Sequence, residues 1–451
     1  MKNILNKKLI ELAESCPYPL YIVGGRVRDF IAGFETSQVD NDICAPADAD
    51  DFVMRAKKVG FTVDAVYRNT GTVKLSYGGD DYEFTCFRSD EYVRGEHKPV
   101  NTYFTKDITL DARRRDFKCN AVYYDISGGQ FVDPLGGIED IRQKRLTTVD
   151  RAEKVFGEDG LRLMRLARIA AQTGFEPSEE CLAGARANKE LIRDVSAERI
   201  YAELNYILHA DEKYGFDGAP YKGLKILKNS GVLGIILPEL AAGDGMEQRS
   251  DFHSYDVLEH SLLAVNYADK SIRLCALLHD VGKPFCMLRD GNFHAHDREG
   301  ARIALDICAR LKVPKKLSER ISKLIELHMY DTRCDAKENK IRRFIVKNYR
   351  YFDEILLLKQ ADYSACKGDL SVAPAVVKMK SIYEKMKSEG VPFTLKQLDI
   401  RGDKLIEAGC PAQKVGAVLD RLLMDCCINL VQNCEDKLLN YAKIVAFNCD
   451  M

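Results

Sequence analysis

The sequence of 451 residues contains no tryptophan, no C-x-x-C pair and no apolar run that approaches the ~20 residues of a membrane-spanning helix. Residues 1–16 also lack the apolar core and the cleavage site of a signal peptide. The 15 cysteines follow no regular spacing, which is typical of reduced thiols. These absences argue against a membrane or secreted protein, and we expect a cytoplasmic location.

The chain has almost no net charge, because 67 Lys and Arg residues balance 68 Asp and Glu residues to −1. A nearly neutral protein has no overall positive field to attract nucleic acid. Any contact with nucleic acid must therefore come from a local basic patch.

Strand and helix signals occupy different parts of the chain. Short segments rich in β-branched and aromatic residues predict strands in the first third, at 18–23, 61–67, 72–77, 82–87 and 121–124. From about residue 150, apolar residues at helical spacing predict helices at 158–171, 197–208, 257–268, 271–279, 301–311 and 316–328. We therefore expect an α+β protein, with an α/β head followed by an all-helical body.

Two short motifs near the N-terminus favour binding of a phosphate-containing ligand. Gly24 and Gly25 follow a predicted strand and precede a predicted helix, a turn that lets backbone N–H groups approach phosphate, and Arg28 adds a positive charge. Asp40 and Asp42, if they lie in a strand, project from one face and can hold Mg²⁺. Taken alone, the aspartates fit a solvated turn equally well.

Further motifs follow in order: Arg114-Arg115-Asp116-Phe117-x-x-Asn120-Ala121 and Glu158-Asp159-x-x-Arg162. With Gly24-Gly25-x-Val27-Arg28-Asp29 and Asp40-x-Asp42, they resemble the class II tRNA nucleotidyltransferases. These CCA-adding enzymes form a poly(A) polymerase-like branch of the polymerase β superfamily. The resemblance implies a polymerase β-type nucleotidyltransferase head that adds CCA to the 3′ end of tRNA from CTP and ATP without a template.

The resemblance also implies roles for individual residues. Asp40 and Asp42 would be the catalytic residues that bind Mg²⁺, with Glu83 as a weaker third candidate. The nucleotide would contact Gly24, Gly25, Arg28, Arg114, Arg115, Asp116, Asn120, Asp159, Arg162 and Arg165. Asp159 and Arg162, three apart on one expected helix, would accept from and donate to the Watson–Crick edge of cytosine or adenine.

The segment between Phe87 and Phe104 corresponds to a loop that helps related enzymes switch from C to A addition. Its usual paired arginines are replaced by His97 and Lys98 here. This departure bears on addition of the terminal A more than on addition of C.

Six of the eight histidines lie between residues 253 and 328. The order His260, His279-Asp280, His296, His328 and Asp362 resembles the HD superfamily of metal-dependent phosphohydrolases. Mixed imidazole and carboxylate ligands suit an open site for Ni²⁺, Mn²⁺ or Mg²⁺ more than a closed zinc site. We expect a divalent metal there.

These signals divide the chain into four predicted domains: a head (1–145), a helical nucleotide-recognition and RNA-binding neck (146–245), an HD domain (246–366) and a C-terminal helical tRNA-contacting region (367–451). Three alternatives stay open. The chain could be a poly(A) polymerase, an enzyme that adds only CC or only A, or an HD phosphohydrolase whose degenerate head only binds RNA. No membrane or obligate protein partner is expected.

Overall fold

A computed structural model describes residues 1, 4–35, 41–91, 100–248 and 255–445. Asp40, His97 and Lys98 lie outside these ranges. The chain separates into two compact units. The first contains Met1–Ala242 and Asp306–Lys315, and the second contains Gly243–Leu305 and Lys316–Met451. The finer division into four domains stays a prediction.

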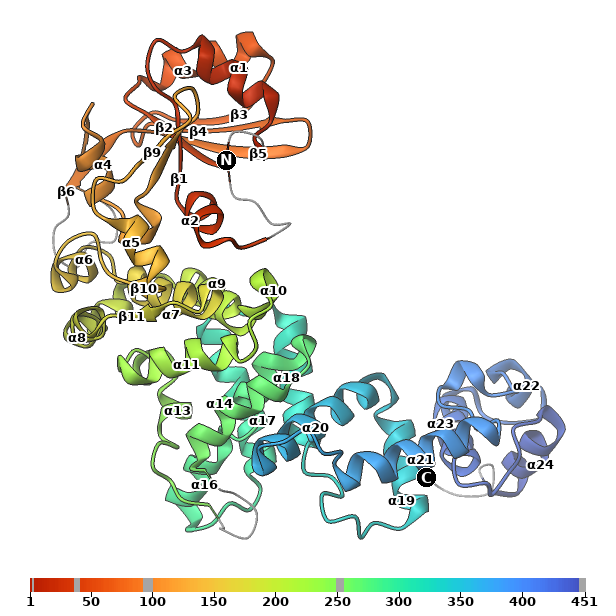
Figure 1. Ribbon diagram of the computed structural model, residues 1–451. Coiled ribbons are helices and arrows are strands. Elements are labelled where there is room, and N and C mark those ends of the chain that lie inside the picture. The colour runs from red at the N-terminus through yellow and green to blue at the C-terminus, as the bar shows by residue number, and fades with distance from the viewer. Residues whose placement is uncertain (2–3, 36–40, 92–99, 249–254, 446–451) are drawn as a thin grey trace. The chain divides into compact units, whose positions relative to one another are not determined.

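The first unit begins with a mixed sheet of seven strands in the order β3-β4-β5-β2-β1-β8-β9 (Figure 1). β2 and β5 run parallel, and the other neighbouring strands pair antiparallel. The strands are β1 (Tyr21–Val23), β2 (Asp42–Ala45), β3 (Thr62–Tyr67), β4 (Thr72–Tyr77), β5 (Asp80–Cys86), β8 (Tyr123–Asp125) and β9 (Phe131–Val132). Separate two-stranded pairs are β6 (Arg88–Glu91) with β7 (Asn101–Phe104) and β10 (Arg145–Leu146) with β11 (Glu176–Pro177).

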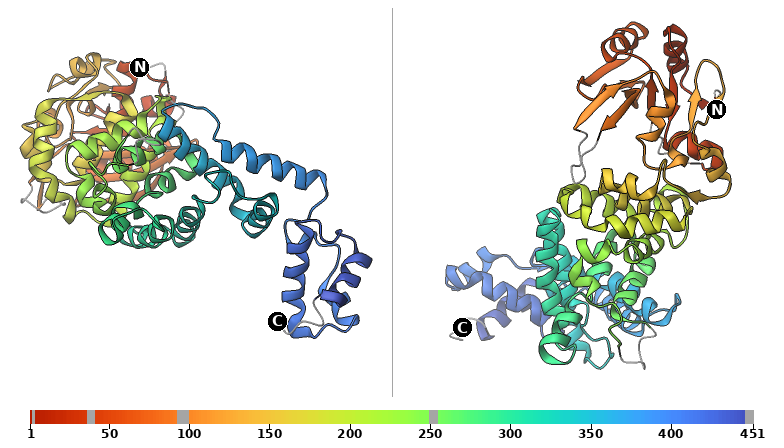
Figure 2. Two further views of the ribbon diagram at one scale, coloured as in Figure 1. Left: turned by 90° about the horizontal axis from the view of Figure 1, so that it is seen from below. Right: turned by 90° about the vertical axis from the view of Figure 1, so that its left-hand side faces the viewer.

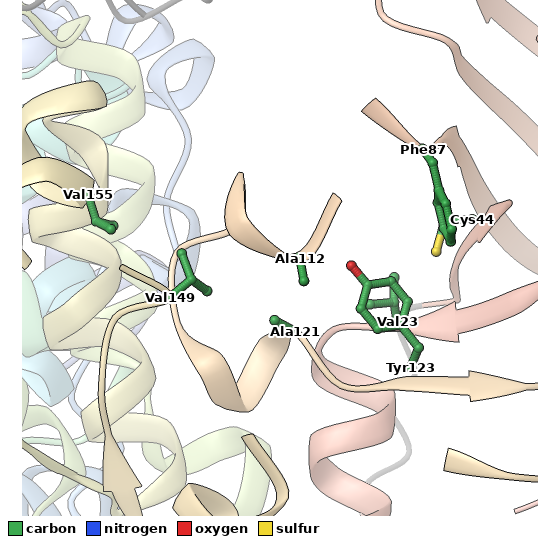
Figure 3. Packing of buried hydrophobic residues seen from close by; sticks show 8 residues of the cluster. All are labelled: Val23, Cys44, Phe87, Ala112, Ala121, Tyr123, Val149 and Val155. Carbon is green, nitrogen blue, oxygen red and sulfur yellow. The ribbon is translucent and has the colours of Figure 1, made fainter. Parts of the chain in front are cut away.

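A cluster of buried apolar residues joins the sheet to the helices beside it (Figure 3). Its members come from β1, β2, β8, α4 (Ile108–Arg113), α6 (Ala152–Glu158) and the connections between them: Val23, Cys44, Phe87, Ala112, Ala121, Tyr123, Val149 and Val155. Tyr123 is fully buried, and Figure 3 shows its hydroxyl directed toward the segment that carries Ala112. The cluster therefore fixes the strand ends and loops from which the polar motifs project.

The helices of the first unit surround and follow this sheet (Figure 1). They are α1 (Lys7–Ser15), α2 (Gly25–Ala32), α3 (Ala49–Val59), α4 (Ile108–Arg113), α5 (Gly137–Arg142), α6 (Ala152–Glu158), α7 (Leu161–Thr173), α8 (Glu179–Asn188), α9 (Ala197–Leu208), α10 (Asp211–Tyr214), α11 (Ala219–Asn229), α12 (Leu233–Ile236) and α13 (Pro238–Ala241).

The second unit is helical. Its elements are α14 (Val257–Tyr267), α15 (Arg273–Leu278), α16 (Gly282–Asp290), most of α17 (His296–Arg310), α18 (Lys315–Leu327), α19 (Glu338–Lys347), α20 (Phe352–Lys367), α21 (Pro374–Ser388), α22 (Gly402–Glu407), α23 (Val415–Cys426) and α24 (Glu435–Val445). The last three helices pack against one another near the C-terminus (Figures 1 and 2).

The predicted α+β fold, with a mixed-sheet head and a helical body, is confirmed. One predicted helix is wrong in detail. Residues 158–171 do not form a single helix, because the backbone is extended at Asp159 (φ −148°, ψ 113°) between α6 and α7. In the described part of the chain every cysteine is a free thiol, and no helix is both long and apolar enough to cross a bilayer.

Candidate nucleotide pocket and metal centre

A pocket of about 300 Å³ in the first unit brings most of the predicted nucleotide-binding residues together. Its lining is Gly24, Gly25, Asp42, Arg114, Arg115, Asp116, Asn120, Asp159, Leu161, Arg162, Arg165 and Arg199. Asp40 lies outside the described residues, while Arg28 and Glu83 are not part of the lining. Sequence motifs separated by more than a hundred positions thus meet at one cavity.

The glycine pair lets the backbone approach the Asp42 carboxylate closely. Gly24 has φ +80°, a conformation that L side chains rarely adopt, and a Cβ there would lie 3.2 Å from Asp42 Oδ2. α2 starts at the next residue, Gly25, so its first N–H groups are at the pocket edge. A larger residue at position 24 would therefore crowd the carboxylate that is predicted to bind metal.

Arg114 and Arg115 are both held by the fully buried Asp111 of α4. Arg114 Nε donates to Asp111 Oδ1 at 2.7 Å, and Arg115 Nη2 donates to Oδ2 at 3.1 Å. Tyr123 Oη also donates to Oδ2, at 2.7 Å. Burial alone would raise the pKa of Asp111, but the two arginines and the hydroxyl outweigh burial and lower it to about 2. Asp111 keeps both guanidinium groups fixed at the pocket wall.

Sequence reasoning did not single out Asp111. The available signal was its spacing, because residues three and four positions apart on a helix are neighbours, and Arg114 and Arg115 stand at those positions.

Asp116 holds Arg165 across the pocket. Its Oδ2 accepts from Arg165 Nε at 2.7 Å, and its Oδ1 accepts from the Phe117 N–H and from Asn120 Nδ2. Burial opposes ionisation, but Arg165 and these hydrogen bonds keep the pKa of Asp116 well below its ordinary value. Arg165 therefore faces a permanent negative charge and has a defined orientation.

Arg28 was predicted to contact the nucleotide, but the structure places it behind the pocket. Its side chain is only 5% exposed, and it donates to Asp29 and to Asn120 Oδ1. A buried guanidinium needs such acceptors, and these bonds hold it inside the protein.

Asp159 and Arg162, the pair predicted to read the base, do not share one helix face as predicted. Asp159 precedes α7, and its Oδ1 accepts from the Leu161 N–H at 2.9 Å, so it caps that helix. The backbone is extended at Asp159 and helical again at Gly160, where a Cβ would lie 2.4 Å from the Leu191 carbonyl oxygen. Both side chains still line the pocket.

Arg162 is 6% exposed and is held by three acceptors within the protein. It donates to Glu158 Oε2 at 2.7 Å and to the carbonyl oxygens of Val155 and Arg114 at 2.8 Å. These contacts fix its guanidinium in the lining of the pocket.

Sequence reasoning missed Arg199 and Leu161 as lining residues. Arg199 lies on α9, 3.8 Å from Asp159 Oδ2, with a side chain that is 46% exposed. The only signal was the predicted helix at 197–208, and helical periodicity did not indicate that Arg199 faces the pocket.

In the second unit, all six predicted HD residues converge from five places in the chain. They form two adjacent groups: His260, His279 and Asp362, and Asp280, His296 and His328. Within each group the candidate ligand atoms lie within 4.8 Å of one another.

Short distances connect the two groups. His260 Nε2 is 3.1 Å from Asp362 Oδ1 and 3.2 Å from His279 Nε2. Asp280 Oδ2 lies 3.3 Å from His279 Nε2, and its Oδ1 lies 3.3 Å from His296 Nε2. Asp280 thus stands between the groups, in position to serve both.

Backbone contacts orient three of the imidazoles in the same way. The Nδ1 atoms of His279, His296 and His328 each lie 2.6–2.8 Å from the carbonyl oxygen three residues earlier. Such contacts favour the tautomer whose Nε2 is a free acceptor, as metal ligation requires. The Nε2 atoms of His296 and His328 are buried and have no hydrogen-bond partner among the described residues. A divalent cation between the groups would satisfy both.

The cluster's electrostatics also favour a cation. Burial would lower the pKa of His279, but the Asp280 and Asp362 carboxylates outweigh burial and raise it to about 10. For His328, burial and the neighbouring histidines lower the pKa to about 3. The carboxylates thus favour a positive charge in the cluster, either the proton on His279 or a cation that displaces this proton, while His328 stays neutral and able to ligate.

Close packing positions these ligands. Gly282, at the start of α16, lies against the turn before α17, where a Cβ would be 2.2 Å from the His296 carbonyl oxygen. Ala295, which precedes His296, has φ +61°. The buried Lys359 donates to the His328 carbonyl oxygen at 2.7 Å. Backbone and side chain together therefore hold this centre rigidly.

Comparison with known families matches three segments of the chain. Residues 20–147 match the poly(A) polymerase head domain, residues 174–243 match the probable RNA- and SrmB-binding site of polymerase A, and residues 251–362 match the HD domain. The nucleotidyltransferase and HD domains imply dependence on divalent metal.

Relatives and solved structures agree with these matches. An A-adding tRNA nucleotidyltransferase of Deinococcus radiodurans is 31% identical over 379 residues, covering 79% of each chain. A CCA-adding enzyme of Geobacillus stearothermophilus is 33% identical over 235 residues, which span about half of each chain (52% and 54%). The crystal structure of the Bacillus stearothermophilus CCA-adding enzyme in complex with CTP has the same fold, with a TM-score of 0.67, 23% identity and coverage of 98% and 99% of the two chains. The chain belongs to the family of class II tRNA nucleotidyltransferases, the CCA-adding enzymes.

Proposed function

We propose that this protein adds CCA to the 3′ end of tRNA, using CTP and ATP and no nucleic-acid template. The observation that carries the proposal is the single pocket in which Asp42, the Gly24 turn, several anchored arginines and Asp159 meet. The relatives are named for A addition or CCA addition to tRNA.

The pocket provides distinct surroundings for the parts of a nucleoside triphosphate. Gly24, Gly25 and the start of α2 offer N–H groups to phosphate oxygens. Arg114 and Arg115 add positive charge on one wall, and Arg165 adds it on another. These anchored groups hold the triphosphate so that the tRNA 3′ hydroxyl attacks the α-phosphorus in line. A new phosphodiester bond forms as pyrophosphate leaves.

Asp42 and Asp40 would hold Mg²⁺, and Glu83 is a third candidate because it pairs in register with Asp42 across the β2–β5 ladder. Carboxylate oxygens are the ligands that Mg²⁺ prefers, and the close approach of Gly24 leaves the Asp42 carboxylate at the pocket wall. When bound, Mg²⁺ lowers the pKa of the attacking hydroxyl and balances charge on the leaving phosphates.

Asp159 and Arg162 would choose the base. A carboxylate accepts from the exocyclic amine of cytosine or adenine, and a guanidinium donates to a ring nitrogen or carbonyl. Uracil and guanine offer the opposite order of donors and acceptors, which would leave buried groups unpaired. The choice between the nucleotide bases would thus come from protein side chains held in fixed positions.

The decisive experiment incubates tRNA lacking its CCA end with Mg²⁺ and one labelled triphosphate at a time, and resolves the products to one nucleotide. Successive addition of two C and one A supports the proposal. Addition of C alone, of A alone or of a long A tract would contradict it.

We further propose that the second unit is a phosphohydrolase that uses a divalent metal such as Ni²⁺, Mn²⁺ or Mg²⁺. The orphaned Nε2 atoms of His296 and His328 support this proposal, because a buried imidazole nitrogen is costly without a partner. The metal would supply an activated water for attack on a phosphoester.

A further inference from the structure

Tyr214, the last residue of α10, contacts α2 through its hydroxyl and the segment just after α2 through its ring. The hydroxyl donates to Asp29 Oδ2 at 2.5 Å and accepts from Arg28 Nη2 at 3.0 Å. The ring packs on Phe34, with the two ring centroids 4.7 Å apart. A helix that follows the head along the chain is therefore joined to the helix that opens at the Gly24-Gly25 turn.

From Tyr214 the hydrogen bonds continue without a break into the pocket. Arg28 donates to Asp29 Oδ1 through Nε (2.9 Å) and Nη2 (2.7 Å), and its Nη1 donates to Asn120 Oδ1 at 2.8 Å. Asn120 Nδ2 donates to Asp116 Oδ1 at 3.2 Å, and Asp116 Oδ2 accepts from Arg165. We call Tyr214, Asp29, Arg28, Asn120, Asp116 and Arg165 the relay.

The relay is buried along its middle. The side chains of Arg28, Asp29 and Asp116 are 5%, 9% and 6% exposed. In such surroundings each charged group needs a particular partner, and its orientation depends on the neighbour that satisfies it. A change in the hydrogen bonds of Tyr214 should therefore alter the orientation of Asp29 and Arg28 and of the residues that they contact. Water does not readily replace a lost hydrogen bond in this buried stretch.

We propose that Tyr214 is a positioning residue for the nucleotide pocket: through the relay, its hydroxyl sets the orientation of the Arg165 guanidinium. The proposal rests on the nucleotidyl transfer proposed above. It gives a role to Arg28, which is buried behind the pocket instead of lining it.

The position of Tyr214 in the chain gives the relay a further consequence. Tyr214 lies within residues 174–243, the segment that matches a probable RNA-binding site. The relay thus connects a helix of that segment to Arg165 of the nucleotide pocket. Since energetic coupling between two sites is reciprocal, CTP bound at Arg165 should also steady α10.

The direct test is Tyr214→Phe, which removes the hydroxyl and keeps the ring on Phe34. We expect the KM for CTP to rise by about three- to tenfold while kcat stays within about twofold, because ground-state and transition-state binding weaken together. Hydrogen exchange of residues 211–214 should slow when CTP binds to the wild type and not to the variant.

Tyr82→Phe is the matched control. Tyr82 belongs to the same unit, is buried and donates to Asp80 Oδ2 at 3.3 Å, outside the relay. Its removal should leave the KM for CTP unchanged. An equal rise in KM in both variants would overturn the proposal, because it would indicate general loosening of the unit.

A double-mutant cycle with Arg165→Lys tests the route itself. If Tyr214 acts through Arg165, Tyr214→Phe should change CTP affinity less than about twofold once Arg165 is replaced. The same fold-change in both backgrounds would overturn the relay. If Tyr214→Phe does not fold, Asp29→Asn, which interrupts the relay outside the pocket lining, takes its place in the cycle. A wild type that adds no nucleotide would instead refute the proposed function.

Discussion

Asp42 of β2 stands in register with Glu83 of β5, on the parallel pair of strands at the middle of the head sheet. Residues in register on adjacent strands project from the same face of a sheet. The two carboxylates are therefore neighbours, although they are 41 positions apart in the chain. This pairing strengthens the case for Glu83, which the sequence alone could not separate from an exposed strand residue.

We predict that Asp42→Ala abolishes nucleotide addition without unfolding the protein, and that Asp40→Ala does the same. Glu83→Gln should raise the Mg²⁺ concentration needed for half-maximal rate, because it removes one charge from the metal-binding face. Single-turnover rates measured against Mg²⁺ concentration check both effects. Asp64→Asn, an exposed change on β3, is the control. If Asp42→Ala keeps more than about a tenth of the wild-type rate, a loss under ~1.4 kcal/mol of barrier, the assignment is wrong.

Base selection should respond to Asp159→Asn and to Arg162→Ala. In Asp159→Asn the amide oxygen can still accept a hydrogen bond from the Leu161 N–H. The amide NH₂ group, however, puts a hydrogen-bond donor where the carboxylate had an acceptor. Discrimination of CTP against UTP should fall by ~1–3 kcal/mol, roughly 5- to 150-fold, because the base amine loses its acceptor. Arg162→Ala should also slow CTP use. The measurement is kcat/KM for all four triphosphates, and unchanged ratios in both variants would contradict the assignment.

Because of Asp111, the free energy of unfolding of the head should depend on pH. Its pKa is about 2 in the folded protein against an ordinary value of 3.8. A depressed folded pKa means stability that is complete above the ordinary value and is lost as pH falls toward 2. We expect ~2 kcal/mol of the free energy of unfolding of the head to disappear between pH 5 and pH 2.

Urea unfolding monitored by hydrogen exchange of head peptides measures this loss. Asp111→Asn should be less stable than wild type at neutral pH by ~3 kcal/mol, since two half-buried guanidinium groups lose their charged, fully buried acceptor. Below pH 3 the difference should shrink. A variant whose stability falls with acid as steeply as the wild type would show that Asp111 is not responsible.

The sequence was a good guide wherever local pattern decides structure. The strands at 62–67 and 72–77 and the helix at 197–208 lie where β-branched and helical periodicity placed them. The ordered motifs also predicted most of the residues that meet at each site, because their resemblance to a known family indicates which segments come together in the fold. The six HD residues converge as that order implied.

What the sequence could not supply was the orientation of side chains set by tertiary contacts. Helical periodicity continued through Asp159, yet the backbone is extended there, and the next residue, Gly160, lies against the Leu191 carbonyl with no room for a Cβ. Arg28 carries a charge that suits phosphate, but Asp29 and Asn120 turn it into the interior. Both outcomes depend on tertiary contacts and on burial. The periodicity of a single sequence reveals neither.

The histidine centre yields the last prediction: the protein binds a divalent metal there and hydrolyses a phosphoester independently of the head. His279→Ala combined with Asp280→Ala removes two adjacent ligands and should abolish both metal binding and hydrolysis. His296→Ala is a milder test, since it deletes one orphaned Nε2 and leaves the carboxylates. His294→Ala, an exposed neighbour, is the matched control.

Metal content of the purified protein is measured first, followed by phosphatase and 2′,3′-cyclic phosphodiesterase assays with Ni²⁺, Mn²⁺ or Mg²⁺. Nucleotide addition should survive in every variant, because the two sites use different residues in separate units. Equal hydrolysis by the wild type and the double variant would assign the activity to a contaminant. If the wild type binds no metal and hydrolyses nothing with any of the three ions, the second unit has only a structural role. The desolvation cost of the buried histidines would then not be offset by a ligand.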